Sequence, residues 1–122
     1  MSFKVIILAG GKGTRIKSVL GNIPKILAPI NKITFLDYLI VWIKSWNICL
    51  EKDIILSTGV GHKAVKEHCK VKEYQIKCIE EKTPLGTFGA IINVARSNFA
   101  KHYLIINGDT VFYANLKKIS DI

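Results

Sequence analysis

The sequence lacks the features that mark membrane and secreted proteins. Its longest apolar stretch, residues 35–43, is interrupted by Asp37 and followed by Lys44, so no run approaches the roughly 18 residues of a membrane-spanning helix. The N-terminus enters a β-rich segment at once and has no charged region followed by a cleavable apolar one. We therefore expect a soluble, cytoplasmic protein with no membrane partner.

Cysteine and acidic residues are also scarce. The three cysteines, Cys49, Cys69 and Cys78, form an odd set without metal-like pairing, which predicts reduced, buried thiols. Only nine Asp and Glu oppose 18 Lys and Arg, a formal net charge of +9. That charge would suit nucleic acid, but many of the lysines lie in residues 63–77, where we expect a solvated helix face and loop. Nucleic-acid binding is therefore the least favoured of the functions that we consider.

The order of apolar segments predicts the fold class. Residues 1–122 form one domain with a core. Helical spacing alternates with β-rich segments, which indicates an α/β fold with a mainly parallel sheet covered on both faces. Ligands of such sheets bind beyond the carboxyl ends of the strands. The expected strands are 4–8, 53–57, 75–79 and 103–106, and the expected helices are 34–47, 61–69 and 86–96.

The most informative motif follows the first strand. After Leu8 the chain reads Gly10-Gly11-Lys12-Gly13-Thr14-Arg15, with Pro24-Lys25 downstream. Glycines let backbone N–H groups approach an anion closely, while the cations contact phosphate oxygens. The spacing fits neither a Rossmann G-x-G-x-x-G nor a Walker A loop. The motif predicts a polyphosphate cradle; the alternative is a tight strand-to-helix turn with solvent-facing cations.

Two further motifs follow later strands. Residues 80–90 include Glu81, Pro84, Gly86, Thr87 and Gly89. The two glycines would let the backbone approach a flat ring closely, and the threonine would cap a helix or donate from its first turn. The carboxylate would accept from guanine N–H groups. The alternative is an ordinary loop with a helix cap. Asp109, after the fourth strand, suits Mg²⁺ held jointly with phosphates, although alone it reads as a turn residue.

Less specific polar residues lie elsewhere in the chain. Residues 58–61 follow the second strand and either line the nucleotide pocket or merely turn the chain. His62, His68 and His102 show no partner spacing, which favours surface or capping roles over catalysis.

Together these motifs resemble the sugar-1-phosphate nucleotidylyltransferases, whose signatures are G-G-x-G-T-R…P-K, E-x-x-P-L-G-T-x-G and G-D. Residues 23–30 with Pro-Leu-Gly-Thr look like the guanylyltransferases acting on heptose 1-phosphate or mannose 1-phosphate. The resemblance implies a Rossmann-like, three-layer nucleotidyltransferase fold. It also implies a reaction in which an NTP, GTP above others, and a sugar 1-phosphate give an NDP-sugar and pyrophosphate.

The resemblance also implies roles for individual residues. Arg15 and Lys25 would be catalytic, and Asp109 would hold Mg²⁺. Nucleotide-binding residues would be Leu8, Gly10, Gly11, Lys12, Gly13, Thr14, Glu81, Pro84, Gly86 and Thr87.

The chain departs from this family in its length. Family members are commonly about twice as long as this chain or longer, and their second half supplies most sugar contacts and a second metal carboxylate. We therefore expect residues 1–122 to be the nucleotide-binding portion, truncated on the C-terminal side. Two hypotheses stay open: a transferase, or a nucleotide-binding module that depends on a partner, which leaves room for a homo-oligomer or a complementing second half.

Overall fold

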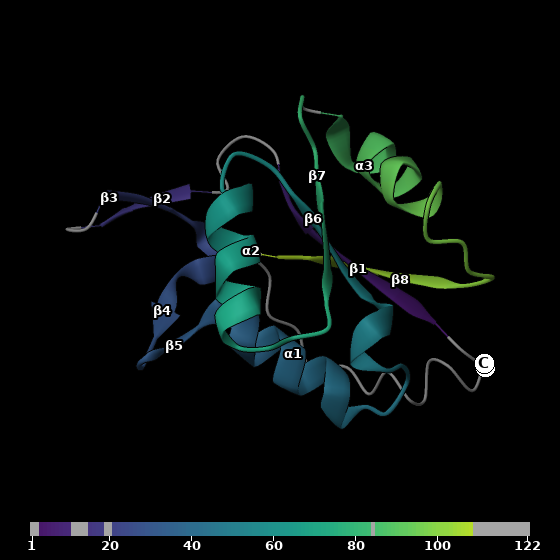
Figure 1. The fold of residues 1–122 in the computed structure, drawn as a ribbon, viewed down its shortest axis with the longest axis horizontal. Coiled ribbons are helices and arrows are strands. Elements are labelled where there is room, and N and C mark those ends of the chain that lie inside the picture. The colour runs from purple at the N-terminus through teal and green to yellow at the C-terminus, as the bar shows by residue number, and fades with distance from the viewer. Residues whose placement is uncertain (1–2, 11–14, 19–20, 84, 109–122) are drawn as a thin grey trace.

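A parallel sheet of four strands forms the centre of the protein (Figure 1). The computed structural model describes residues 3–10, 15–18, 21–83 and 85–108, with residues 15–18 and 21–23 as backbone only. The strand order is β7-β6-β1-β8, and every pair is parallel, as the sequence predicts. The strands are β1 (Lys4–Ala9), β6 (Ile54–Thr58), β7 (Lys77–Glu80) and β8 (Tyr103–Asn107).

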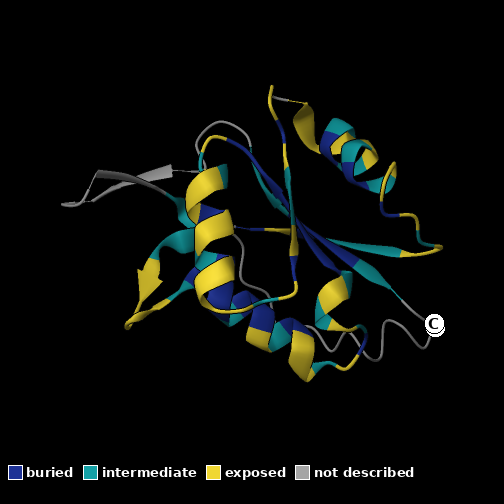
Figure 2. Ribbon diagram, viewed as in Figure 1, coloured by how far each residue is buried: buried dark blue, intermediate teal, exposed yellow. Residues whose placement is uncertain are grey.

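Three helices cover the two faces of this sheet. They are α1 (Phe35–Ser45), α2 (His62–Val71) and α3 (Gly86–Ala95), each close to its predicted range. Side chains of β1 and β6 alternate between the faces: Ile54 and Leu56 pack with α1 and α2, whereas Ile55 packs with Val94 of α3. The result is the predicted three-layer α/β arrangement, whose central strands are the most buried part of the chain (Figure 2).

Two short hairpins between β1 and α1 were not predicted. The first pairs β2 (Arg15–Ser18) with β3 (Gly21–Pro24), and a 3-10 turn, η1 (Lys25–Leu27), follows it. The second pairs β4 (Pro29–Ile30) with β5 (Ile33–Thr34). A further 3-10 turn, η2 (Glu51–Asp53), precedes β6. The glycine-rich motif is thus followed by a hairpin, not by the helix of the alternative interpretation.

A buried carboxylate joins α1 to α2. Thr34 caps α1 by accepting from the N–H of Asp37, whose carboxylate also receives Tyr74 Oη at 2.6 Å and His68 Nε2 at 2.9 Å. Burial alone would raise the pKa of Asp37, but the hydrogen bonds from Tyr74, His68 and Thr34 outweigh it and lower that pKa to about 2. His68 therefore has a partner after all, one that lies too far along the chain for its spacing to reveal.

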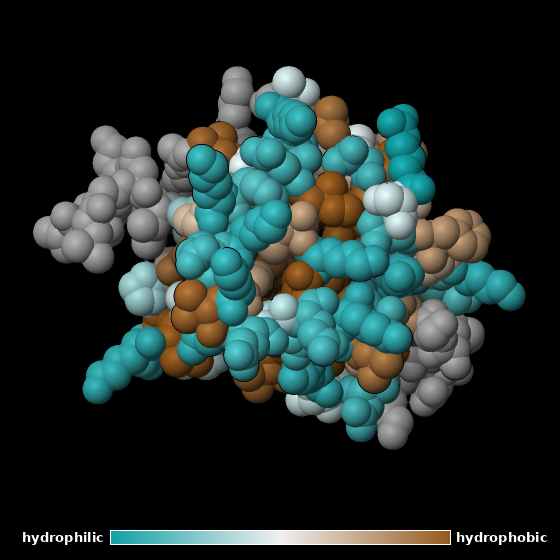
Figure 3. Space-filling view, in the orientation of Figure 1, coloured by the Kyte–Doolittle hydropathy of each residue, from teal (hydrophilic) through white to brown (hydrophobic). Residues whose placement is uncertain are grey.

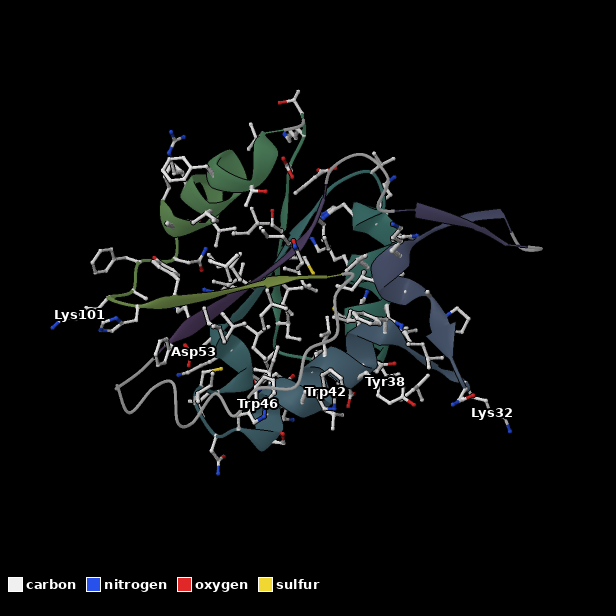
Figure 4. The ribbon with its side chains drawn as sticks, turned by 180° about the vertical axis from the view of Figure 1, so that it is seen from behind. Lys32, Tyr38, Trp42, Trp46, Asp53 and Lys101 are labelled. Carbon is white, nitrogen blue, oxygen red and sulfur yellow. The ribbon has the colours of Figure 1, made fainter. Side chains whose placement is uncertain are left out.

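The remaining composition-based expectations can be checked on the surface. Lys63, Lys66 and Lys70 of α2 are exposed, as are Lys72 and Lys77, and hydrophilic side chains cover most of this face (Figure 3). All three cysteines are free, with Cys69 buried and the other two half-buried. Trp42 lies on α1 and Trp46 is its C-cap residue, and both pack partly against the core (Figure 4). Within the described residues, no helix is long and apolar enough to cross a membrane.

Candidate functional site

A cleft opens at the carboxyl ends of the parallel strands. Its wall includes the end of β1 (Leu8 to Gly10), the end of β8 with Gly108, the start of α3 and Lys25 of η1. After β1 the chain moves outward to β6 and β7 and then returns to β8 on the other side of β1. Such a reversal separates the loops of neighbouring strands and leaves a crevice for ligands. The cleft lies where the fold class predicts a ligand site.

Gly10 and Glu81 bring two predicted segments into contact. A Cβ added at Gly10 would collide with Oε2 of Glu81 and would lie 3.4 Å from the backbone nitrogen of Gly59. A side chain at position 10 would therefore have to displace the carboxylate of Glu81. The glycine-rich motif after β1 and the acidic motif after β7 thus meet at one point of the cleft.

Glu81 is held in place by its own backbone and by α3. Its N–H donates to the carbonyl of Thr58 at 2.6 Å, and its Oε1 accepts from the N–H of Leu85 at 2.5 Å. Only 9% of the residue is exposed. Leu85 is the N-cap of α3, and no side chain caps this helix, so the predicted capping role of Thr87 is wrong. Thr87 is instead in the first turn, where it lines the cleft.

The start of α3 needs glycine for a different reason. Gly86 has φ +72°, and nothing lies within 4 Å of an added Cβ. A side chain would fit the space there but would strain the left-handed backbone. Because the first turn of a helix leaves N–H groups unpaired, this end of α3 presents hydrogen-bond donors beside the acidic Glu81.

The first hairpin brings together the two cationic positions. In the register of β2 and β3, Arg15 lies opposite Pro24, the residue before Lys25. Lys25 itself lines the cleft. The ring of Pro24 packs so tightly on Gly61 that a Cβ at position 61 would overlap it. Gly61, in the turn before α2, thus packs against the residue that precedes Lys25, and residues 58–61 are not among those that line the cleft.

Comparison with known proteins identifies the family. Residues 5–116 match the MobA-like NTP transferase domain. The chain belongs to this family. It is 39% identical over 118 residues to the D-glycero-alpha-D-manno-heptose 1-phosphate guanylyltransferase of Campylobacter jejuni subsp. jejuni, covering 95% of this chain and 52% of that protein. It is 31% identical to the mannose-1-phosphate guanylyltransferase of Mycobacterium tuberculosis, covering 95% of this chain and 32% of that one.

Solved structures of nucleotidyltransferases also resemble the fold of this chain. HddC from Yersinia pseudotuberculosis, crystallised with GMP-PN, superposes with a TM-score of 0.82 at 35% identity and covers 99% of this chain and 53% of that chain. The CTP:phosphocholine cytidylyltransferase of Streptococcus pneumoniae shares the fold at a TM-score of 0.73 and 24% identity, covering 95% of this chain and 49% of that chain. The chain spans about half the length of the first of these relatives. The resemblance to nucleotidyltransferases is confirmed.

Some of the predicted site residues lie together in the described part of the chain, and the others lie outside it. Leu8, Gly10, Lys25, Glu81, Gly86 and Thr87 line one cleft. For Arg15 only the backbone is described. Gly11, Lys12, Gly13, Thr14, Pro84 and Asp109 lie outside the described residues.

The described residues offer no complete metal site. No group of three or more His, Cys, Asp or Glu side chains in the described ranges could hold a metal ion. The one described carboxylate in the cleft, Glu81, already accepts from Leu85. Asp109 follows Gly108, which lines the cleft, and a carboxylate at that position fits the oxygen ligands that Mg²⁺ prefers.

Sequence reasoning missed two polar residues of the NTP transferase domain's cleft. Ser57 and Asn107 both line it, near the ends of β6 and β8. A serine inside an apolar strand carries no motif, so only its register beside Leu8 reveals its place. Asn107 precedes the predicted Gly-Asp pair, and its position at the strand end was the available signal.

Proposed function

We propose that the protein binds a nucleoside triphosphate, GTP above others, and transfers its nucleotidyl group to a sugar 1-phosphate of the heptose or mannose type. The observation that carries this proposal is the convergence of Gly10, Lys25, Glu81 and the start of α3 on one cleft. The names of the relatives support guanine and heptose 1-phosphate, and the complex of HddC with GMP-PN supports a guanine nucleotide.

The chemistry requires little from the protein beyond alignment and charge. A sugar phosphate is already anionic near neutral pH, so it can attack the α-phosphate without a general base. The oxygen–phosphorus bond to the sugar phosphate forms as the bond to pyrophosphate breaks. Lys25 would neutralise the charge shared by both phosphates, and Arg15, opposite Pro24 in the hairpin, would stabilise the departing pyrophosphate.

The remaining groups would bind the nucleotide. The N–H groups of the glycine-rich motif would contact the triphosphate, and Glu81 would accept from the base. Mg²⁺, held by Asp109, would neutralise phosphate charge when bound.

Titration of the full chain with GTP and Mg²⁺ tests the nucleotide site. Replacing Lys25 by alanine should weaken binding about 10- to 100-fold, the effect of losing a hydrogen bond to a charged group. Lys101→Ala is the matched control: it removes an exposed lysine that precedes β8, at the opposite end of that strand from the cleft. Equal affinity of the Lys25 variant and the wild type would remove the proposal.

A nucleotide-binding module without turnover is the second candidate. Gly10, Glu81 and the start of α3, which line the cleft, would all serve the nucleotide. Release of pyrophosphate from GTP in the presence of heptose or mannose 1-phosphate distinguishes the two. Clear release supports the transferase, whereas GTP binding without release supports the module.

A further inference from the structure

Ser57 on β6 has an unusual hydroxyl. The residue is completely buried, and its Oγ is the single buried side-chain nitrogen or oxygen in the described ranges without a hydrogen-bond partner. A buried hydroxyl without a partner destabilises the folded state, because it has lost its bonds to water. Such a group calls for an explanation, and a ligand is one.

The register of the sheet places Ser57 on the cleft side. It alternates with Leu56, which faces α1 and α2, and so shares the α3 face with Ile55. Its cross-strand neighbours are Leu8 of β1 and Ile79 of β7. Ser57 lines the same cleft as Leu8 and the first turns of α3. The hydroxyl therefore belongs to the inner wall of the candidate nucleotide site.

The next residue, Thr58, shows that the fold can satisfy a hydroxyl on this strand. Its Oγ1 lies 2.6 Å from Nδ1 of His62 and donates to the carbonyl of Ile79 at 3.3 Å. Both residues are buried, and both belong to β6. The chain thus provides partners for the hydroxyl facing away from the cleft and none for the one facing it.

The charges around the cleft decide which part of a nucleotide reaches Ser57. Glu81 lies two residues after Ile79, the cross-strand neighbour of Ser57, and lines the same cleft as Ser57. A phosphate there would meet a like charge. The cation Lys25 enters the cleft from η1. The phosphates therefore suit the Lys25 side, and the uncharged base suits the side of Ser57 and Glu81.

We propose that the Ser57 hydroxyl donates a hydrogen bond to a carbonyl of the nucleobase while the Glu81 carboxylate accepts from the adjacent ring N–H. This inference rests on the proposed nucleotide site. An N–H beside a carbonyl is present in guanine, hypoxanthine and uracil, and it is absent from adenine and cytosine. Ser57 is thus a specificity-determining residue that selects bases with this pair of groups.

Affinities of the full chain for GTP, ITP, UTP and ATP with Mg²⁺ test the inference. Wild type should bind the first three more tightly than ATP. Ser57→Ala should weaken their binding by about 3- to 10-fold, the effect of one neutral hydrogen bond. Binding of ATP should change by less than about twofold. The melting temperature of the free Ser57→Ala protein should be no lower than that of wild type, since the lost hydroxyl had no partner.

Thr58→Val is the matched control on the same strand. It removes a hydroxyl that has partners, so the melting temperature should fall while the ratio of GTP to ATP affinity stays that of wild type. Ser57→Cys, whose thiol is slightly larger and a weaker donor, provides a second variant if the alanine variant does not fold, and it should also lower the ratio. An unchanged ratio in both Ser57 variants, or an equal loss for every nucleotide together with a lower melting temperature, would overturn the inference. If wild type binds none of the four nucleotides, the proposed function fails as well.

Discussion

Replacing Asp37 by asparagine should remove a stabilising charge that depends on pH. The pKa of Asp37 is lowered from 3.8 to about 2, because hydrogen bonds from Tyr74, His68 and Thr34 outweigh the effect of burial. At about 1.4 kcal/mol per pKa unit, this corresponds to about 2 kcal/mol of the free energy of unfolding. Since the pKa is lower in the folded state, the contribution is present above pH 3.8 and is lost as the pH falls toward 2.

Urea denaturation of wild type and Asp37→Asn at intervals between pH 7 and pH 2 measures this contribution. The free energy of unfolding of wild type should fall more steeply than that of the variant below about pH 5, and the two curves should approach each other near pH 2. Asp53→Asn is the matched control, because this half-buried carboxylate lies on η2, outside the Asp37 cluster, and its variant should keep the steep fall.

Tyr74→Phe provides an independent check on the cause. It removes the donor whose oxygen lies 2.6 Å from Asp37 Oδ1. The pKa of Asp37 should then rise toward its ordinary value, which makes the pH dependence shallower and the protein less stable at pH 7 by about 1.5–3 kcal/mol. If wild type and Asp37→Asn have the same pH dependence between pH 5 and pH 2, the reasoning is refuted.

Three glycine substitutions test the packing of the cleft. Gly10→Ala should lower the melting temperature and weaken GTP binding about tenfold or more, because the new methyl group displaces Glu81. Adding Glu81→Ala to this variant should restore the melting temperature but not the binding. If the double variant melts no higher than Gly10→Ala, the collision is contradicted. Gly61→Ala should lower the free energy of unfolding by about 1–3 kcal/mol through overlap with Pro24, measured by urea denaturation; a wild-type value would contradict it. Gly86→Ala should lower the free energy of unfolding by about 1–2 kcal/mol, because alanine strains the left-handed backbone. Gly86→Asn should lower it less in the same assay, since asparagine tolerates this conformation. Equal losses in the two variants would argue for a different cause.

The regular elements could be predicted because their residues repeat with a period. The strands around Val5, Ile55 and Ile105 are short apolar runs, and the buried residues of α1 follow helical spacing. The hairpin of β2 and β3 could not be predicted in this way. Its residues Arg15–Ser18 and Gly21–Pro24 are mostly polar or turn-forming, and its pairing shows only in three dimensions.

The candidate site was predictable where motifs follow strands and unpredictable where packing decides. Gly10, Glu81 and Gly86 stand in recognisable segments, so their convergence followed from the rule for parallel sheets. The contact of Pro24 with Gly61 joins segments with no shared pattern. Ser57 stands at the end of an apolar strand, where a single serine gives no periodic signal.

The central position of β1 affects how the chain assembles as it is made. β1 leaves the ribosome before both of its neighbours, Ile54–Thr58 on one side and Tyr103–Asn107 on the other. Pairings this distant in sequence form slowly. Until they form, the apolar run from Val5 to Leu8 has two open edges, a situation that favours aggregation. We therefore expect the yield of soluble protein to depend strongly on chaperones during synthesis, because β1 has both neighbours in place only after β8 is made.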